Sequence, residues 1–178
     1  SPFFMEGIKS FAYEVSEQLK DELPDHVVFP VGNGSLFIGA FKGFEEMVAR
    51  GDMERIPSLH AVQAAAVRPI VAAFTGEIWT KADASRTVAG GISVVDPPHL
   101  HRMLPILRTT GGSAVAVSDD EILRWQRLLT EKEGVFGETT SAAAFAGLEA
   151  LVKRGVIGSG DRVLVPVTGF GLKDAPQE

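Results

Sequence analysis

The feature that most constrains the fold is an alternation of short apolar runs with segments of helical periodicity. The runs are largely apolar and rich in β-branched residues, and they occupy residues 26–31, 59–63, 113–117 and 162–167. Strands buried on both faces have this composition, and such strands form parallel sheets that helices cover on each side. The sequence therefore predicts an α/β fold, with an open, mostly parallel twisted sheet and helices on both faces.

Helical segments separate the apolar runs. In these segments apolar residues recur at three- and four-residue spacing, which is the pattern of a helix with one buried face. The predicted helices cover residues 7–20, 36–50, 97–107, 119–133 and 140–154. Pro105 is expected to bend or break the third helix, because proline cannot donate the helical hydrogen bond. No repeat or linker interrupts the pattern, so residues 1–178 are predicted to form a single domain.

Composition narrows the partners and the location. The chain carries 17 Lys and Arg against 23 Asp and Glu, a net charge of −6, without a basic stripe. Binding to nucleic acid or to an anionic membrane surface is therefore not expected. No apolar run is long enough to predict a membrane span. The chain has no cysteine, which excludes disulfides and thiolate metal sites and fits a reducing cytoplasm, the predicted location.

A glycine-rich turn follows the first predicted strand. Gly32-Asn33-Gly34-Ser35 leads directly into a helix. Glycines let backbone amides converge on one point, and the helix N-terminus adds free N–H groups and partial positive charge, so the segment predicts a phosphate site. It lacks the Gly-Lys-Ser/Thr of an ATP loop, and Phe37 stands where a dinucleotide fingerprint needs its third glycine. The alternative is a tight strand-to-helix turn that binds nothing.

A second candidate segment follows the last predicted strand. Thr168-Gly169-Phe170-Gly171-Leu172-Lys173-Asp174 brings a hydroxyl residue into a Gly-x-Gly turn. Open parallel sheets bind ligands at the carboxyl ends of their strands, and this segment lies at such an end. The Thr168 hydroxyl could bond a ligand ring atom there. The alternative is a glycine-rich end of the chain without a ligand.

Together with other segments, these two turns resemble threonine synthase and its relatives, which are fold-type II enzymes that use pyridoxal 5′-phosphate. The resemblance spans nearly all 178 residues, and it is specific through the order of the motifs rather than through any one of them. The further matching segments are Glu6-Gly7-Ile8-Lys9-Ser10, Leu59–Ala64, Thr87–Ile92, Glu133–Phe136 and Ser141–Ala143.

The resemblance implies roles for seven residues. The backbone amides of Gly32, Asn33, Gly34, Ser35 and Leu36 would hold the cofactor phosphate. Thr168 would bond the pyridine nitrogen and, as a neutral hydroxyl, leave it largely unprotonated. Glu138 would lie near the face of the cofactor. The chain departs from the family pattern at Ser35-Leu36, at Thr139 in place of proline and at Phe170 in place of histidine, so the amino-acid substrate stays open.

The lysine that forms a Schiff base with the cofactor is not recognisable. The family carries it in a Ser/Phe-Lys-Asp/Asn motif upstream of the phosphate loop, and none of the seven lysines has that context. No catalytic residue is therefore assigned within the chain. We expect the chain to be the C-terminal portion of an enzyme whose N-terminal, lysine-bearing portion is absent. Its abrupt start, Ser-Pro-Phe-Phe, agrees with this, and the chain alone is expected to show no turnover.

Three functions follow as hypotheses. The first is a pyridoxal phosphate-dependent lyase that resembles threonine synthase and converts O-phosphohomoserine and water to threonine and phosphate. Threonine dehydratase-like and cysteine synthase-like reactions are its nearest alternatives. The second is a non-catalytic module that binds a phosphorylated ligand, and the third is a domain whose glycine loop is only structural. The family habit implies a homodimer with an exposed apolar surface. The spacing His99-x-His101 puts two histidines on different sides of a helix, so no metal site is predicted.

Overall fold

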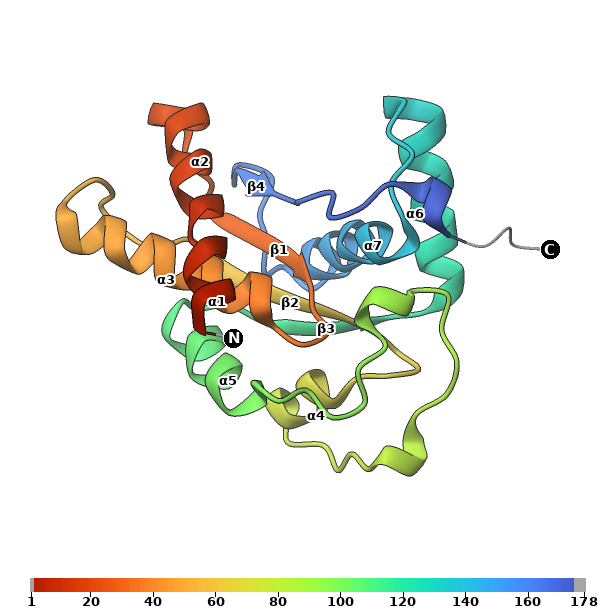
Figure 1. Ribbon diagram of the computed structural model, residues 1–178. Coiled ribbons are helices and arrows are strands. Elements are labelled where there is room, and N and C mark those ends of the chain that lie inside the picture. Colours follow the sequence, from red (N-terminus) through yellow and green to blue (C-terminus); the bar gives the residue numbers. More distant parts are fainter. Residues whose placement is uncertain (1, 175–178) are drawn as a thin grey trace.

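The computed structural model describes residues 2–174 and contains the predicted parallel sheet. Neighbouring strands pair in the order β3-β2-β1-β4, and every pair is parallel (Figure 1). Val27 of β1 lies in register with Leu59 of β2 and Leu164 of β4. The predicted α/β fold class is confirmed. The strands are β1 (His26–Pro30), β2 (Ser58–Ala64), β3 (Ala114–Val117) and β4 (Val163–Leu164).

The last strand is much shorter than the predicted run of residues 162–167. Only Val163 and Leu164 pair with β1. Pro166 has no N–H to give to a ladder, and the next amides turn to a different partner. The N–H groups of Thr168 and Gly169 both donate to the Ser141 hydroxyl oxygen, at 2.9 and 3.2 Å. The chain thus leaves the sheet early because a helix supplies its hydrogen bonds.

One face of the sheet is covered by the N-terminal helices. Phe29 and Leu59 point to this side, and they pack with Phe37 and Phe44 in a continuous buried cluster. Figure 1 shows α2, α3 and α5 on this side of the strands. The helices of this layer are α1 (Pro2–Ile8), α2 (Ser10–Leu19), α3 (Ser35–Arg50), α4 (Pro69–Thr75) and α5 (Leu100–Thr109).

The opposite face is covered by α7 (Thr139–Lys153), with α6 (Asp119–Glu133) packed against it. Val28, next to Phe29 on β1, belongs to this second cluster because successive side chains of a strand point to opposite faces. Its helical partners are mostly alanines of α7, which let the helix approach the sheet closely. Both faces are therefore buried, as the apolar runs predict.

Two helix predictions need correction. The predicted helix over residues 7–20 is two helices, α1 and α2, separated at Lys9. Pro105 does not break α5, which starts only at Leu100 and continues through the proline to Thr109. Met103, Ile106 and Leu107 of this helix are buried in the core, and this burial outweighs the hydrogen bond that Pro105 cannot donate.

Residues 76–99 form a long connection that the sequence pattern did not resolve. It contains two short 3-10 segments, η2 (Lys81–Asp83) and η3 (Gly90–Ile92), and it passes below the sheet in Figure 1. Two more such segments, η1 (Lys20–Glu22) and η4 (Gly171–Lys173), end α2 and close the described chain. Within residues 2–174, no helix is both long and apolar enough to cross a membrane.

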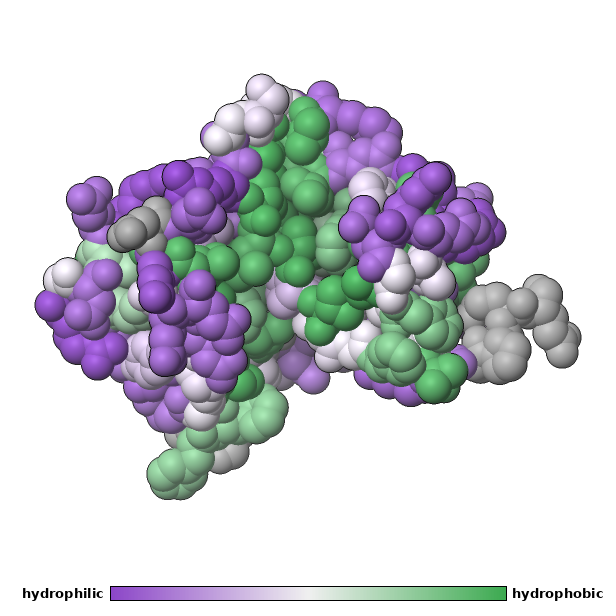
Figure 2. All heavy atoms as spheres, turned by 90° about the horizontal axis from the view of Figure 1, so that it is seen from above, coloured by the Kyte–Doolittle hydropathy of each residue, from purple (hydrophilic) through white to green (hydrophobic). Residues whose placement is uncertain are grey.

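Apolar side chains remain uncovered along one side of the molecule. Figure 2 looks down on the molecule from the side where β4 lies in Figure 1, and it shows a band of hydrophobic residues between polar flanks. Large apolar side chains are also exposed in the segment that follows β4, where Val167, Phe170 and Leu172 are 46%, 59% and 80% exposed. On α1, Phe3 is 86% exposed.

Candidate functional site

The loop from β1 to α3 carries a set of backbone donors without partners. Val31 still donates its N–H to Val62 O, so the sheet ladder ends there. Among the described residues, none accepts a hydrogen bond from the N–H groups of residues 32–37. The first of these belong to the loop and the last to the first turn of α3, where no intrahelical acceptor exists. Free amides at a helix start attract an anion, as the sequence predicted for this loop.

Two glycines of the loop allow no side chain. Gly34 has φ +84°, a left-handed conformation, and a Cβ there would overlap the Met103 thioether. A Cβ on Gly32 would lie 2.9 Å from Gly91 O, closer than real Cβ contacts. Because nothing larger than glycine fits at either position, the backbone can approach a ligand closely. The Asn33 side chain is exposed.

A cavity opens over this loop. Its volume is about 330 Å³, and α1 contributes Phe4 and Ile8 to its wall, while Gly91 of η3 closes another side. The free amides and the Ser35 hydroxyl border the same cavity. Their donor chemistry suits a phosphate group.

Thr168 lies at the second strand end that the sequence singled out. Its side chain is exposed, and its hydroxyl lies 3.0 Å from the Ser141 hydroxyl and donates to Glu138 Oε1 at 3.2 Å. Ser141 is fully buried in the first turn of α7, and Glu138 precedes that helix and is only 5% exposed. The structure thus places Glu138 beside Thr168, beneath the surface.

The segment after Thr168 is clamped onto the start of α7. Lys173 pairs with Glu138 at 2.5 Å, and the hydrogen bond that its ammonium donates to this carboxylate raises the pKa of Lys173 above its ordinary value. Asp174 accepts the N–H of Thr139 at 2.7 Å. A Cβ on Gly169 would collide with the Glu138 carboxylate, which explains a glycine next to Thr168.

Contacts of η3 connect the two strand ends. Gly91, which limits the space at Gly32, donates its N–H to Thr140 Oγ1 at 3.1 Å. Thr140 directly precedes Ser141, the partner of Thr168. The glycine loop and Thr168 therefore meet at the same edge of the sheet, the carboxyl ends of β1 and β4. Sequence reasoning assigned no role to Ser141 or Thr140, although a run of hydroxyl residues at the start of an alanine-rich helix was a usable signal.

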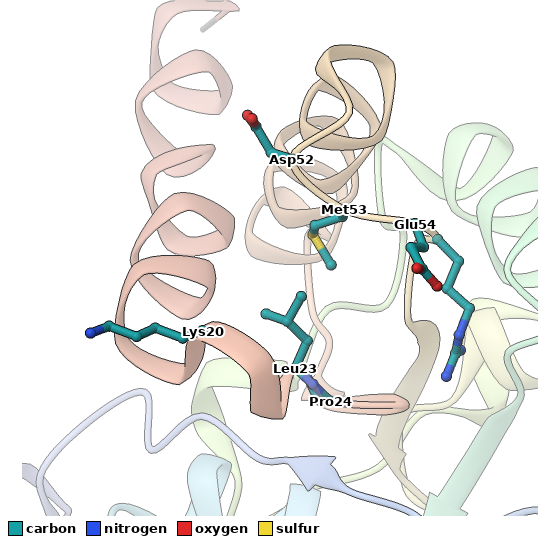
Figure 3. A pocket seen from close by; sticks show the side chains of 7 residues that line it. Lys20, Leu23, Pro24, Asp52, Met53 and Glu54 are labelled. Carbon is teal, nitrogen blue, oxygen red and sulfur yellow. The ribbon is translucent and has the colours of Figure 1, made fainter.

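Another cavity, at the opposite edge of the sheet, has different chemistry. Its volume is about 410 Å³, and it lies between the segments that lead into β1 and β2. Figure 3 shows Leu23 and Met53 pointing toward each other at its centre, whereas Lys20 and Asp52 point away from it. Lys20 is thus directed outward, and the other cationic side chain of the lining, Arg55, is paired with Asp25, so this cavity presents no converging donors.

Most of the lysines are held in ion pairs, and one of them, Lys173, pairs with Glu138 beside Thr168. Lys9 and Lys42 both pair with Glu6. Because of this ion pair, Lys42 does not point toward the start of its own helix, α3. The other ion pairs that involve a lysine are Lys9–Glu46, Lys81–Asp96, Lys153–Glu149 and Lys173–Glu138. None of the lysines lines the cavity over the glycine loop. Within the described part of the chain, no cluster of three or more His, Asp or Glu residues suits a metal ion.

Comparisons with known proteins identify the family of the chain. The family model for pyridoxal-phosphate dependent enzymes matches residues 1–169. Threonine synthase of Methanocaldococcus jannaschii is 37% identical over 176 residues, which are 98% of this chain and 44% of the relative. Threonine synthase of Methanosarcina acetivorans has the same identity and the same coverage. The chain thus spans less than half the length of these curated relatives.

Solved structures share the fold. A fungal L-serine ammonia-lyase from Rhizomucor miehei has a TM-score of 0.74 at 23% identity, covering 94% of this chain and 52% of that one. A threonine deaminase from T.th. has a TM-score of 0.73 at 23% identity, covering 99% of this chain and 61% of that one. At this identity the likeness speaks for the fold. The family match over most of the chain goes further, and the chain belongs to the pyridoxal-phosphate dependent enzymes.

Proposed function

We propose that the chain is the cofactor-binding portion of a threonine synthase-like enzyme, which converts O-phosphohomoserine and water to threonine and phosphate. The observation that carries the proposal is the loop from β1 to α3, where unpaired amides border a cavity. The identity of 37% to two threonine synthases supports this reaction over the other chemistries of the family. The activity is proposed for the whole enzyme, because the chain spans less than half of those relatives.

The described residues fit a phosphorylated pyridine cofactor. The amides of Gly32, Asn33, Gly34, Ser35 and Leu36 would hold the phosphate, since no larger residue fits at the two buried glycines. Thr168 would meet the ring nitrogen, with Ser141 and Glu138 behind it. When bound, pyridoxal phosphate supplies an electron sink that stabilises negative charge on a substrate carbon. The chain's own part is to bind the phosphate and orient the ring.

A lysine from outside these 178 residues would anchor the cofactor. Five of the seven lysines are in ion pairs, and none lines the cavity. We propose that this lysine comes with a further portion of the enzyme, which would cover the apolar band of Figure 2. The chain alone should then show no turnover. The homodimer and the cytoplasmic location stay predictions.

The proposal is tested by titrating the purified chain with pyridoxal 5′-phosphate. Cofactor absorbance and protein fluorescence report binding, and borohydride reduction followed by intact mass reports a covalent adduct. We expect saturable binding that inorganic phosphate competes away, without a specific adduct. Gly34→Ala should abolish this binding, whereas Gly51→Ala, also at a left-handed glycine but in open space, should leave it intact.

Two outcomes would contradict the proposal in different ways. Absence of saturable binding would mean that the loop is only a structural turn. A single reduced adduct would mean that one of the seven lysines is the anchor and that no outside lysine is needed. Peptide mapping would identify that lysine, and an adduct spread over the exposed Lys20 and Lys132 would mark nonspecific labelling instead.

A further inference from the structure

We propose that Asp119 is a positioning residue for the phosphate site, because its carboxylate holds in place the segment that walls the cavity over the glycine loop. This wall segment comprises residues 87–94, and Gly91 within it borders the cavity. Asp119 lies in the first turn of α6, in the layer that α6 and α7 form. The inference rests on the proposed function, since it assigns Asp119 a part in holding a phosphorylated ligand.

Both oxygens of the Asp119 carboxylate bond the start of the wall segment. Oδ1 accepts the Thr87 hydroxyl at 2.6 Å, and Oδ2 accepts the Val88 N–H at 3.0 Å. A carboxylate offers only acceptors, and its hydrogen bonds are stronger than those between neutral groups. Because the two bonds go to neighbouring groups of the chain, they fix the orientation of the wall segment as well as its distance from α6.

The Asp119 side chain is not needed to cap its own helix. Ser118 and Glu121 form a capping box at the start of α6, in which Ser118 Oγ accepts the Glu121 N–H at 3.3 Å. The next residue, Asp120, is exposed, and within residues 2–174 its side chain has no hydrogen bond or ion pair. Both aspartates place negative charge at the helix start, which is favourable there. Of the two, it is Asp119 that reaches the wall segment.

The wall segment has few other hydrogen bonds to the rest of the fold. Among the described residues, these are the Thr139 hydroxyl donating to Val88 O at 2.8 Å and the Gly91 N–H donating to Thr140 Oγ1 at 3.1 Å. The segment's other hydrogen bonds are internal. Asp119 thus accepts two of the four hydrogen bonds that join the wall segment to α6 and α7.

The wall segment touches the glycine loop directly. A Cβ on Gly32 would lie 2.9 Å from Gly91 O and 3.3 Å from Ile92 Cα, so the two backbones are in contact. Ala89 and Ile92 are fully buried in the apolar cluster of α7, which seats the segment from behind. A shift of the wall segment would therefore displace the loop amides or widen the cavity. A site that is held in its binding geometry beforehand binds more tightly, because less ordering accompanies binding.

The test compares Asp119→Ala with Asp120→Ala, which removes the same charge from the same helical turn. Binding of pyridoxal 5′-phosphate to the full 178-residue chain is followed by protein fluorescence, under conditions where circular dichroism shows each variant folded. We expect Asp119→Ala to raise the dissociation constant about tenfold, the size of one hydrogen bond to a charged group, and Asp120→Ala to change it less than about twofold. Hydrogen exchange of the wall segment without ligand should be faster in Asp119→Ala and unchanged in Asp120→Ala.

Two further variants test the contact itself. In Asp119→Asn the amide oxygen can accept the Val88 N–H and the NH₂ group can donate to Thr87 Oγ1, so the dissociation constant should stay within about threefold of the wild type. Thr87→Val removes the partner hydroxyl at nearly constant shape and should raise the dissociation constant about threefold. Added to Asp119→Ala, it should cost less than about twofold more, because both changes remove one shared interaction.

Equal dissociation constants for Asp119→Ala and Asp120→Ala would overturn the inference and leave the proposed function standing. A lower free energy of unfolding in Asp119→Ala together with wild-type affinity would also overturn it, because the carboxylate would then serve stability alone. Should Asp119→Ala not fold, Thr87→Val decides, and wild-type affinity in that variant would overturn the inference. Failure of the wild type to bind the cofactor would overturn the proposed function and this inference with it.

Discussion

The two edges of the sheet differ in how completely their polar groups are satisfied. At the carboxyl edge, the amides of residues 32–37 have no partner among the described residues, and Thr168 is exposed. At the amino edge, His26 Nδ1 lies 2.9 Å from His60 Nε2, and His60 Nδ1 accepts the Ser113 N–H at 3.0 Å. One edge offers donors to a ligand, and the other has used them within the fold.

At the amino edge, the ring nitrogens of His26 and His60 all have hydrogen-bond partners. Because His60 Nδ1 accepts from Ser113, the hydrogen-bond network puts the ring proton of the neutral His60 on Nε2, which donates to His26 Nδ1. His26 Nε2 then donates to Asp161 Oδ2, at 3.2 Å. Every ring nitrogen has a partner, so this cluster contributes to stability, whereas the carboxyl edge leaves backbone donors unpaired.

The largest effect that would test this contrast is expected at Gly34. Gly34→Ala places a Cβ against Met103 at φ +84° and should destabilise the fold by about 2–5 kcal/mol, from left-handed strain and overpacking together. Binding of pyridoxal 5′-phosphate should be lost. Gly51→Ala, at φ +80° with nothing near it, should cost about 1–2 kcal/mol and leave binding unchanged. Urea unfolding and cofactor titration measure both. Wild-type binding by Gly34→Ala would remove the glycine loop from the site.

At the amino edge we expect His60 to lower the free energy of unfolding by about 3 kcal/mol at acidic pH. Burial, and secondly the charge of His26, lower the pKa of His60 from 6.5 to about 4. The fold therefore prefers the neutral ring, and this stability is fully present above pH 6.5 and is lost as the pH falls toward 4. Urea unfolding at pH 7 and pH 4.5 should show a larger loss in the wild type than in His60→Asn. Equal losses would mean that other groups cause the acid sensitivity.

An intermediate effect is expected for Ser141, which accepts two backbone hydrogen bonds at the carboxyl edge. Ser141→Ala leaves the N–H groups of Thr168 and Gly169 without their acceptor and should cost about 2 kcal/mol. Ser93→Ala, at an exposed serine, should stay within about 0.5 kcal/mol of the wild type. Thermal and urea unfolding compare the two. A cost for Ser141→Ala no larger than that of Ser93→Ala would show that the clamp on α7 adds little stability.

The smallest effect is expected at Asn33, inside the same loop. Its side chain is exposed, so Asn33→Ala should change stability by no more than about 0.5 kcal/mol. Cofactor affinity should change less than about threefold, because in the proposed site the backbone amides, and not this side chain, hold the phosphate. Isothermal titration would measure the affinity. A large loss would mean that the Asn33 side chain itself binds the ligand.

Much of the fold follows from local pattern. α6 starts at Asp119 as predicted, where Ser118 and Glu121 form a capping box and Glu121 N–H donates to Ser118 Oγ. The apolar runs located all four strands. Pattern failed where distant groups compete, as at β4, which ends early because Ser141 takes the next amides, and at Pro105, which buried neighbours keep within α5.

The sequence by itself determined the fold class, the glycine loop and the family resemblance, because periodicity and motif order are local properties. It also predicted Gly32, Gly34 and Thr168 as candidate site residues. Only the tertiary structure decided that Gly91 and Thr140 join the two strand ends, and that Ser141 and Glu138 are hydrogen-bond partners of Thr168. The physical reason is that hydrogen bonding depends on which donors and acceptors folding brings together, and residues 138 and 168 are neighbours only in space.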